Sequence, residues 1–134
     1  MPRVAAAERY PAGLGLKNIS LWVLQLAVAA TFFKAAVPKL TGAEMMVHMF
    51  AAIGFGQWLR YLTGSLEVIG AAALLIPALS GLGALLLIVV MAGAVLTHLI
   101  ILGGSPALAA ILLIASAIIA WGRRERMVET WRRF

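Results

Sequence analysis

The sequence predicts an all-α membrane protein, in which four transmembrane helices form a bundle and a short amphipathic interfacial helix separates the first span from the second. Three observations support this fold class. Of the 134 residues, 63% are hydrophobic and 12% are charged, and the mean hydropathy is +1.02. An average soluble domain is about 45–50% apolar and about 25% charged. In addition, four long apolar segments follow one another, and the charges concentrate at the chain ends.

The four apolar segments are the expected membrane spans. A helix needs about 20 predominantly apolar residues to cross a bilayer, and residues 19–40, 58–77, 80–102 and 105–122 come close to that length. The short connections PALSG and GGSP, which separate the last three segments, contain the Pro and Gly that end helices. We therefore expect tight helical hairpins at both connections.

The segment between the first two spans, residues 41–57, predicts the interfacial helix. Its apolar side chains recur at helical spacing, as is typical of a helix that lies in the plane of a membrane surface. These side chains are Met45, Met46, Met49, Phe50 and Ile53.

The polar chain ends predict the orientation in the membrane. Residues 1–18 hold three and residues 123–134 hold five of the eleven Lys and Arg residues. Because cytoplasmic segments are enriched in Lys and Arg, we expect a bacterial inner-membrane protein with both termini in the cytoplasm. The domain organisation is then an N-terminal segment (1–18), a four-helix membrane domain (19–122) and a basic tail (123–134).

The basic tail has two readings. Its apolar side chains, Met127, Val128, Trp131 and Phe134, recur at helical spacing between charged residues. This pattern is typical of a helix on the inner membrane surface, and a solvated basic tail is the alternative. The positive charge at both termini favours anionic lipid headgroups as partners over nucleic acid.

Composition excludes several kinds of site. The sequence has no Cys, which excludes disulfides, iron–sulfur clusters and thiolate metal sites in this chain. It has two His, and His48 stands four residues after Glu44, a spacing more typical of a helix pair than of a metal site. We therefore expect no bound metal and no covalent cofactor.

Glu67 is the clearest functional signal in the spans. A charged side chain near the bilayer centre costs about 2.5–3.5 kcal/mol on insertion scales. Its helical face also carries small and polar residues, which predicts that the face points into the bundle. The face comprises Arg60, Thr63, Gly64, Gly70, Ala71 and Leu74. Glu67 either ties helices together structurally or handles a proton or ligand.

The other titratable groups of the spans are expected at the same, outer side as Glu67. Lys34 and Lys39 lie five residues apart, about 140° around a helix, so both cannot face Glu67, and one is expected to snorkel to headgroups. Lys39, Arg60 and His98 lie near the predicted outer boundary. With Glu67 they can line a pocket for a molecule with a polar head group and an apolar body, or they can be structural.

Three stretches carry a family resemblance. These are VPKLTG (37–42), MVHMFAAIGFGQWLRYLTGSLEVIGAAALLIP (46–77) and VLTHLIILGGSP (95–106). Together they resemble the DoxX-like family of small four-helix membrane proteins over roughly residues 20–122. Lys39, Glu67 and His98 match the family pattern position by position, which implies that Lys39 is the inward lysine. Lys34 departs from the pattern, and we expect it to contact lipid or a partner.

The resemblance implies a function only in outline. The family is named from a subunit of a membrane thiosulfate:quinone oxidoreductase. The expectation is a membrane subunit of a redox-linked complex, with partner membrane subunits and an outer-half pocket for a quinone- or lipid-like molecule. Glu67 would handle a proton, and Lys39 and His98, with Arg60 and Thr63, would bind the head group.

Two other function classes stay open. One is a non-catalytic structural or assembly subunit, in which the polar residues only fix helix register. The other is a small proton-coupled transporter, which ranks last because small multidrug exporters carry their Glu in the first span. Without Cys or an evident metal or flavin site, the chain is not expected to be a redox catalyst by itself, and whether it acts as an enzyme is open.

Overall fold

The computed structural model describes residues 15–133, except for the side chains of Arg126, Thr130 and Arg133. Among the described residues the secondary structure is helical, and no strand is present. Most of the predicted N-terminal segment (1–18) and the last residue of the predicted tail, Phe134, lie outside the described residues.

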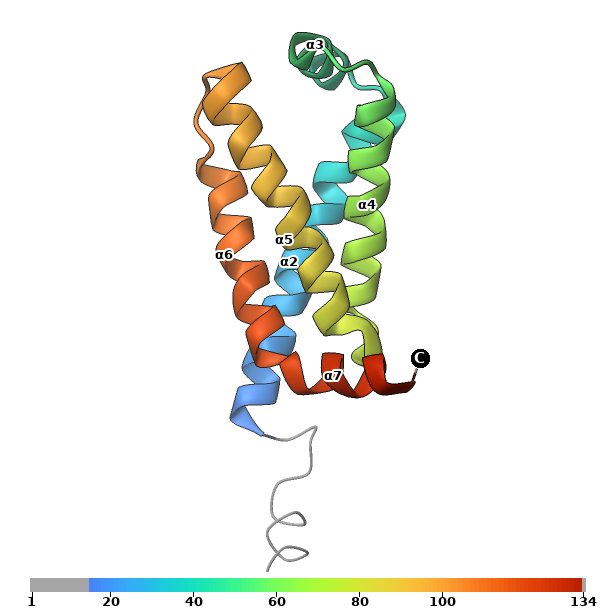
Figure 1. The fold of residues 1–134 in the computed structure, drawn as a ribbon, viewed down its shortest axis with the longest axis vertical. Helices are drawn as coiled ribbons and strands as arrows, with labels where there is room; N and C mark the ends of the chain where they lie inside the picture. Colours follow the sequence, from blue (N-terminus) through green and yellow to red (C-terminus); the bar gives the residue numbers. More distant parts are fainter. Residues whose placement is uncertain (1–14, 134) are drawn as a thin grey trace, which may run out of the picture.

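Four long helices lie along the long axis of the molecule and alternate in direction (Figure 1). They are α2 (Leu16–Thr41), α4 (Trp58–Leu74), α5 (Ser80–Thr97) and α6 (Ala107–Gly122). A short 3₁₀ helix, η1 (Pro77–Leu79), precedes α5, and a π-helix, η2 (His98–Leu102), continues it. The π-helix was not predicted from the sequence.

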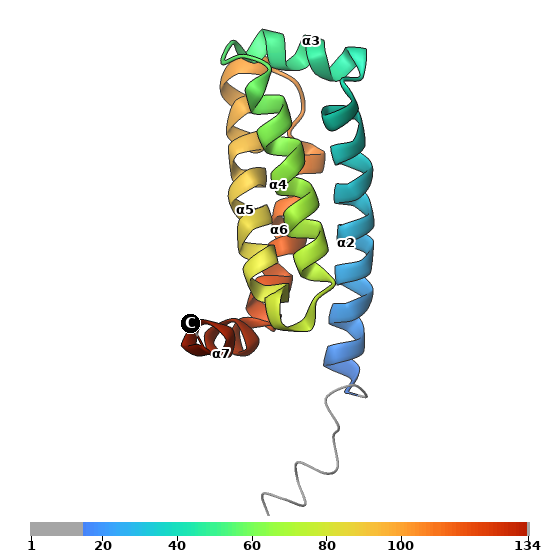
Figure 2. The same ribbon diagram turned by 90° about the vertical axis from the view of Figure 1, so that its right-hand side faces the viewer.

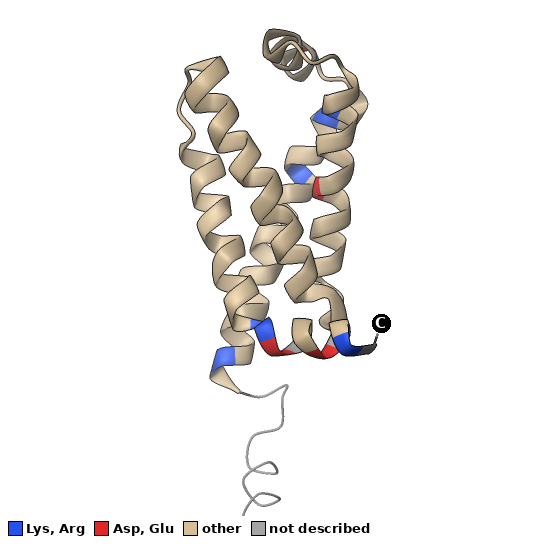
Figure 3. Cartoon of the chain, viewed as in Figure 1, with Lys and Arg blue, Asp and Glu red and all other residues tan. Residues whose placement is uncertain are grey.

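Two shorter helices cross the opposite ends of this bundle. Helix α3 (Glu44–Ile53) crosses one end and α7 (Arg124–Arg133) crosses the other (Figures 1 and 2). We call these the α3 end and the α7 end. Both helices lie where the sequence predicted amphipathic segments. The charged positions lie at the α7 end and within the half of the bundle toward the α3 end, with an uncharged stretch between the two groups (Figure 3).

The four long helices pack in a ring: α2 contacts α4, α4 contacts α5, α5 contacts α6, and α6 returns to α2. The centre of the ring holds fully buried apolar side chains, among them Phe32, Leu74, Leu87 and Ile119. Small residues bring the backbones close, because a Cβ at Gly83 would lie 2.9 Å from the carbonyl oxygen of Gly70. Close packing of this kind is what holds helices together where no hydrophobic drive acts between them.

Length and composition identify two candidate membrane-spanning helices among the described residues. They are Leu16–Thr41 and the continuous segment Pro77–Leu102. Helices α4 and α6 have 17 and 16 residues, fewer than the roughly 20 that a full crossing requires. Helix α2 also begins three residues before the predicted first span.

Candidate functional site

The predicted ionisable pair lies at the interface between α2 and α4. The Nζ of Lys39 lies 3.0 Å from Oε1 of Glu67, and the Glu67 side chain is 2% exposed whereas that of Lys39 is 15% exposed. Lys39 Nζ also donates a hydrogen bond of 3.3 Å to the carbonyl oxygen of Ala35, one turn earlier in α2. The ammonium group therefore lies at the edge of the bundle, and the carboxylate lies behind it.

Gly64 explains why the two helices approach so closely here. A Cβ at this position would lie 3.0 Å from the side chain of Leu40 and 3.1 Å from Cβ of Lys39. Any larger residue would therefore press against the last turn of α2. Gly64 precedes Glu67 by three residues and lies on the same helix face, so the Gly-x-x-Glu pattern combines the close approach with the carboxylate that pairs with Lys39.

The predicted inward face of α4 is confirmed. All six buried residues of α4 belong to that face, including the two charged residues Arg60 and Glu67. Thr63 is half-buried at the edge of the face.

Arg60 has extensive contacts within the protein. Its Nε donates a 2.8 Å hydrogen bond to Oε1 of Gln57, its Nη1 donates to the carbonyl oxygen of Lys39, and its guanidinium lies 4.2 Å from the centroid of the Tyr61 ring. The last carbonyl groups of a helix have no partner within the helix, and Arg60 supplies one for α2. Arg60 is 4% exposed, so a ligand can reach its guanidinium only by displacing these contacts.

The end of α2 leaves room for this guanidinium. Gly42 has a positive φ of 76°, and a Cβ there would lie 3.5 Å from Nη1 of Arg60. Gln57 extends the contacts further, because its Nε2 donates a 3.0 Å hydrogen bond to the carbonyl oxygen of Val47 in α3.

His98 lies apart from the ion pair. It is half-buried at the first position of η2, and its Nδ1 forms a 2.9 Å hydrogen bond with the carbonyl oxygen of Ala94. Within residues 15–133, no hydrogen bond or ion pair joins His98 or Thr63 to Lys39 or Glu67. Helix α3 contacts η2, α4 and α2, so it connects the segment of His98 to the helices of the ion pair.

The remaining sequence candidates are on the surface. Lys34 is exposed on α2. His48 Nε2 lies 3.6 Å from Oε1 of Glu44, and both side chains are exposed. In the described part of the chain, no group of three or more His, Cys, Asp or Glu side chains is placed to hold a metal ion.

Sequence reasoning missed a buried polar cluster near the α7 end. Arg123 donates from Nε to Oε1 of Gln25 (2.7 Å) and from Nη1 to Oδ1 of Asn18 (2.6 Å). Gln25 Nε2 in turn donates to the carbonyl oxygen of Leu74 (2.6 Å). The sequence placed Arg123 in the basic tail, but the structure buries it. The signal that could have found the cluster is Gln25, an amide within an otherwise apolar span.

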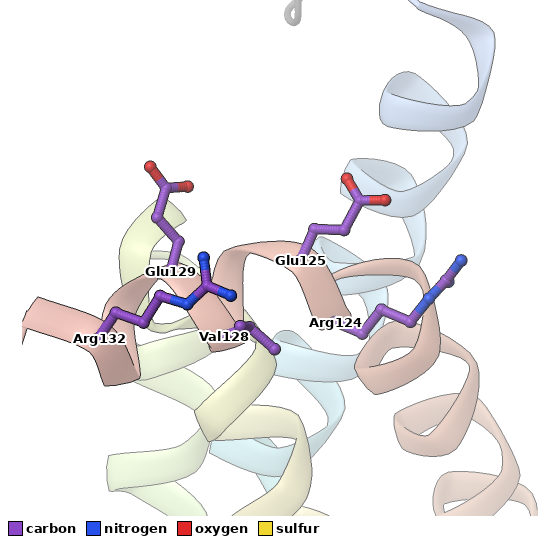
Figure 4. A pocket seen from close by; sticks show the side chains of 5 residues that line it. All are labelled: Arg124, Glu125, Val128, Glu129 and Arg132. Carbon is purple, nitrogen blue, oxygen red and sulfur yellow. The ribbon is translucent and has the colours of Figure 1, made fainter.

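A surface hollow also lies along α7 (Figure 4). It is lined by Arg124, Glu125, Val128, Glu129 and Arg132. Figure 4 shows the carboxylates of Glu125 and Glu129 on the same side of the helix. Alternating positive and negative side chains are typical of a solvated helix face, so we do not assign a ligand to this hollow.

Comparison with protein families identifies a matching family. The family model described as the DoxX-like family matches residues 23–123, which include Lys39, Glu67 and His98. No curated protein and no solved structure shows significant similarity to the chain.

Proposed function

Because the chain belongs to the DoxX-like family, a family of membrane-associated proteins, we propose that it is a multi-pass membrane subunit of a redox-linked complex. In this proposal α2, α4, α5 and α6 all cross the bilayer. The Lys39–Glu67 pair binds the head group of a quinone- or lipid-like molecule at the α3 end.

The packing of the helices supports four crossings. Helices α4 and α6 are shorter than α2, but each packs against α5 and runs antiparallel to it. Their outward faces carry large exposed apolar side chains, which suit contact with lipid. Examples are Leu62 and Ile69 on α4, and Leu108, Ile111 and Ile114 on α6.

The distribution of charge supports an orientation with the α7 end in the cytoplasm of a bacterial cell. The two connections at the α3 end, residues 42–57 and 103–106, contain no Lys or Arg. The described part of the α7 end carries Lys17, Arg123, Arg124 and Arg132. Because positive residues favour the cytoplasmic side, the Lys39–Glu67 pair would lie toward the outer surface.

The buried Lys39–Glu67 pair is the observation that carries the proposed binding site. An ionisable residue within a membrane domain is a functional candidate by default. An ammonium group has three donors, and Lys39 directs its Nζ to Glu67 and to the carbonyl oxygen of Ala35. One donor of the partly exposed Lys39 is therefore left for a carbonyl oxygen of a ligand.

Glu67, which is more buried than Lys39, would supply a proton to the bound molecule or accept one from it. Quinone reduction takes up protons, so a titratable carboxyl near the quinone oxygens has a chemical purpose. His98 and Thr63 are proposed as further head-group contacts, since Nε2 of His98 is not used in the bond to Ala94. Lys34, exposed on α2, would contact lipid or a partner subunit.

The proposal is tested by quinone binding to the full chain in lipid nanodiscs. A water-soluble short-chain benzoquinone is titrated, and its binding is followed by quenching of tryptophan fluorescence. We expect Lys39→Met and Glu67→Gln each to weaken binding by roughly tenfold or more, because a hydrogen bond to a charged group is worth about 1.5–3 kcal/mol. Lys34→Met, an exposed lysine on the same helix, serves as the matched control and should bind normally. Unchanged binding in both site variants would refute the proposal.

A second function is a non-catalytic assembly subunit. The observation that favours it is that polar groups toward the α3 end contact one another, since Lys39 pairs with Glu67 and Arg60 caps α2. Such a subunit would co-purify with a larger membrane complex and would not bind the quinone.

A further inference from the structure

We propose that Arg60 and Gln57 are positioning residues. Through them, the position of α3 on the bundle determines how Lys39 is held relative to Glu67. The sequence pointed to Arg60 as a ligand contact, but its contacts assign it a different role. The inference concerns the site of the proposed function, and its geometry can be tested in protein that holds no ligand.

The coupling follows a continuous series of contacts. Val47 in α3 accepts a hydrogen bond from Gln57 (3.0 Å), whose Oε1 accepts one from Arg60 (2.8 Å). Arg60 donates to the backbone carbonyl of Lys39, and the side chain of the same Lys39 lies 3.0 Å from Glu67. Each link joins two groups in direct contact, so α3 and the ion pair are separated by two side chains.

Arg60 is well suited to hold Lys39. A guanidinium group is planar and has five donors in a fixed geometry, so it can bind Gln57 and the end of α2 at the same time. Its burial at 4% exposure keeps water from competing for these contacts. Because Arg60 fixes the backbone of Lys39, it also fixes the point from which the lysine side chain reaches Glu67.

Helix α3 also contacts the part of the bundle that does not carry the ion pair. Its buried side chain is Phe50, and the helix contacts η2, which begins at His98. A shift of α3 on η2 would therefore pull on Gln57 and, through Arg60, on Lys39. This arrangement links η2, the segment that begins at His98, to the Lys39–Glu67 pair without direct contact between them.

Chemical labelling of Glu67 tests the coupling. Dicyclohexylcarbodiimide is an apolar reagent that modifies protonated carboxyl groups. The carboxyl proton moves to a carbodiimide nitrogen while the carboxyl oxygen adds to the central carbon, and the product rearranges to a stable N-acylurea that mass spectrometry can locate. Pairing with Lys39 favours the ionised form of Glu67, which does not react, and loss of this cation favours the protonated form, so labelling should be faster without it.

Two variants interrupt the series at different links. Arg60→Gln removes the donor to Lys39, and we expect labelling of Glu67 on the order of tenfold faster, as for the loss of about 1.4 kcal/mol. Gln57→Ala keeps every charge and the bond from Arg60 to Lys39, and it removes the bond to Val47 together with the acceptor of Arg60 Nε, so we expect a smaller acceleration of about threefold. Arg60→Lys should be intermediate between Arg60→Gln and the unchanged protein, because one ammonium group cannot reproduce the fixed fork of donors.

Controls make the result specific. Lys39→Met sets the upper limit of the labelling rate. Ser65→Ala changes an exposed residue of the same helix α4 and should label at the unchanged rate. If Arg60→Gln fails to fold, Gln57→Ala decides. A normal labelling rate in Gln57→Ala, or an equal acceleration in Ser65→Ala, would overturn the proposal. The assay contains no quinone, so a failure of quinone binding leaves its outcome unaffected.

Discussion

Replacing Lys39 should destabilise the protein more than replacing its partner Glu67. Lys39→Met leaves a carboxylate that is 2% exposed and has lost its cation. Breaking a buried pair in this way costs about 3–5 kcal/mol, because the carboxyl group then either keeps an uncompensated charge in the interior or has to take up a proton. We therefore expect Lys39→Met to lower the free energy of unfolding by about 4 kcal/mol.

Glu67→Gln should be milder because the remaining group can adapt. Lys39 is 15% exposed and keeps its bond to the carbonyl oxygen of Ala35, and a lysine stem can move its ammonium group toward water or headgroups. We expect a loss of about 1 kcal/mol, near the net value of an ordinary hydrogen bond. In the double variant neither charge is left, and we expect a total loss of about 2 kcal/mol, so that the two substitutions couple by about 3 kcal/mol.

The assay is reversible unfolding in mixed detergent micelles, followed by the helical circular dichroism signal. The four proteins, unchanged, Lys39→Met, Glu67→Gln and double, are measured under identical conditions. Two results would refute the reasoning: a coupling energy near zero, or a larger loss for Glu67→Gln than for Lys39→Met. Either would mean that the carboxylate does not depend on this lysine.

The other stability predictions concern close packing and the polar cluster at the α7 end. Gly83→Ala should destabilise the protein by about 1–3 kcal/mol, because its Cβ would lie 2.9 Å from the carbonyl oxygen of Gly70. Gly93→Ala, with nothing within 4 Å of the added Cβ, should be neutral or stabilising by up to about 1 kcal/mol, and equal effects of the two in the same unfolding assay would contradict this. Gln25→Leu should cost about 1–3 kcal/mol, because it removes an acceptor from the buried Arg123, and an unchanged unfolding midpoint would count against that role.

The sequence predicted the positions of the helices well, because long apolar runs and Pro–Gly connections leave few alternatives. The inward face of α4 was also predictable. A carboxylate at Glu67 is tolerated only when it faces a partner, and the small residues beside it mark the packed side. The DoxX-like resemblance, confirmed by the family match over residues 23–123, added Lys39 as the inward lysine.

Contacts between residues far apart in the sequence could not be predicted from the sequence pattern. Arg60 was predicted as a ligand contact, and the structure adds contacts with Gln57, the Tyr61 ring and the backbone carbonyl of Lys39; a backbone acceptor is not revealed by a side-chain pattern. That contact exists because Gly64 lets α2 approach α4, and the distance follows only from the packed structure. The π-helix at His98 was missed for a related reason, since its residues, HLIIL, fit an α-helix equally well.

The cluster of Asn18, Gln25 and Arg123 has a consequence for biosynthesis. Gln25 and Arg123 are 98 residues apart, and Asn18 and Arg123 are 105 residues apart. The chain is made from its N-terminus, so α2 is complete long before Arg123 emerges from the ribosome, and in the proposed topology α2 has by then entered the bilayer. During that interval Gln25 depends on water, lipid or insertion factors for a partner at its Oε1. Arg123, at the end of α6, then binds Gln25 and Asn18 of α2, which makes closure of the ring by α6 and α2 a late step of assembly.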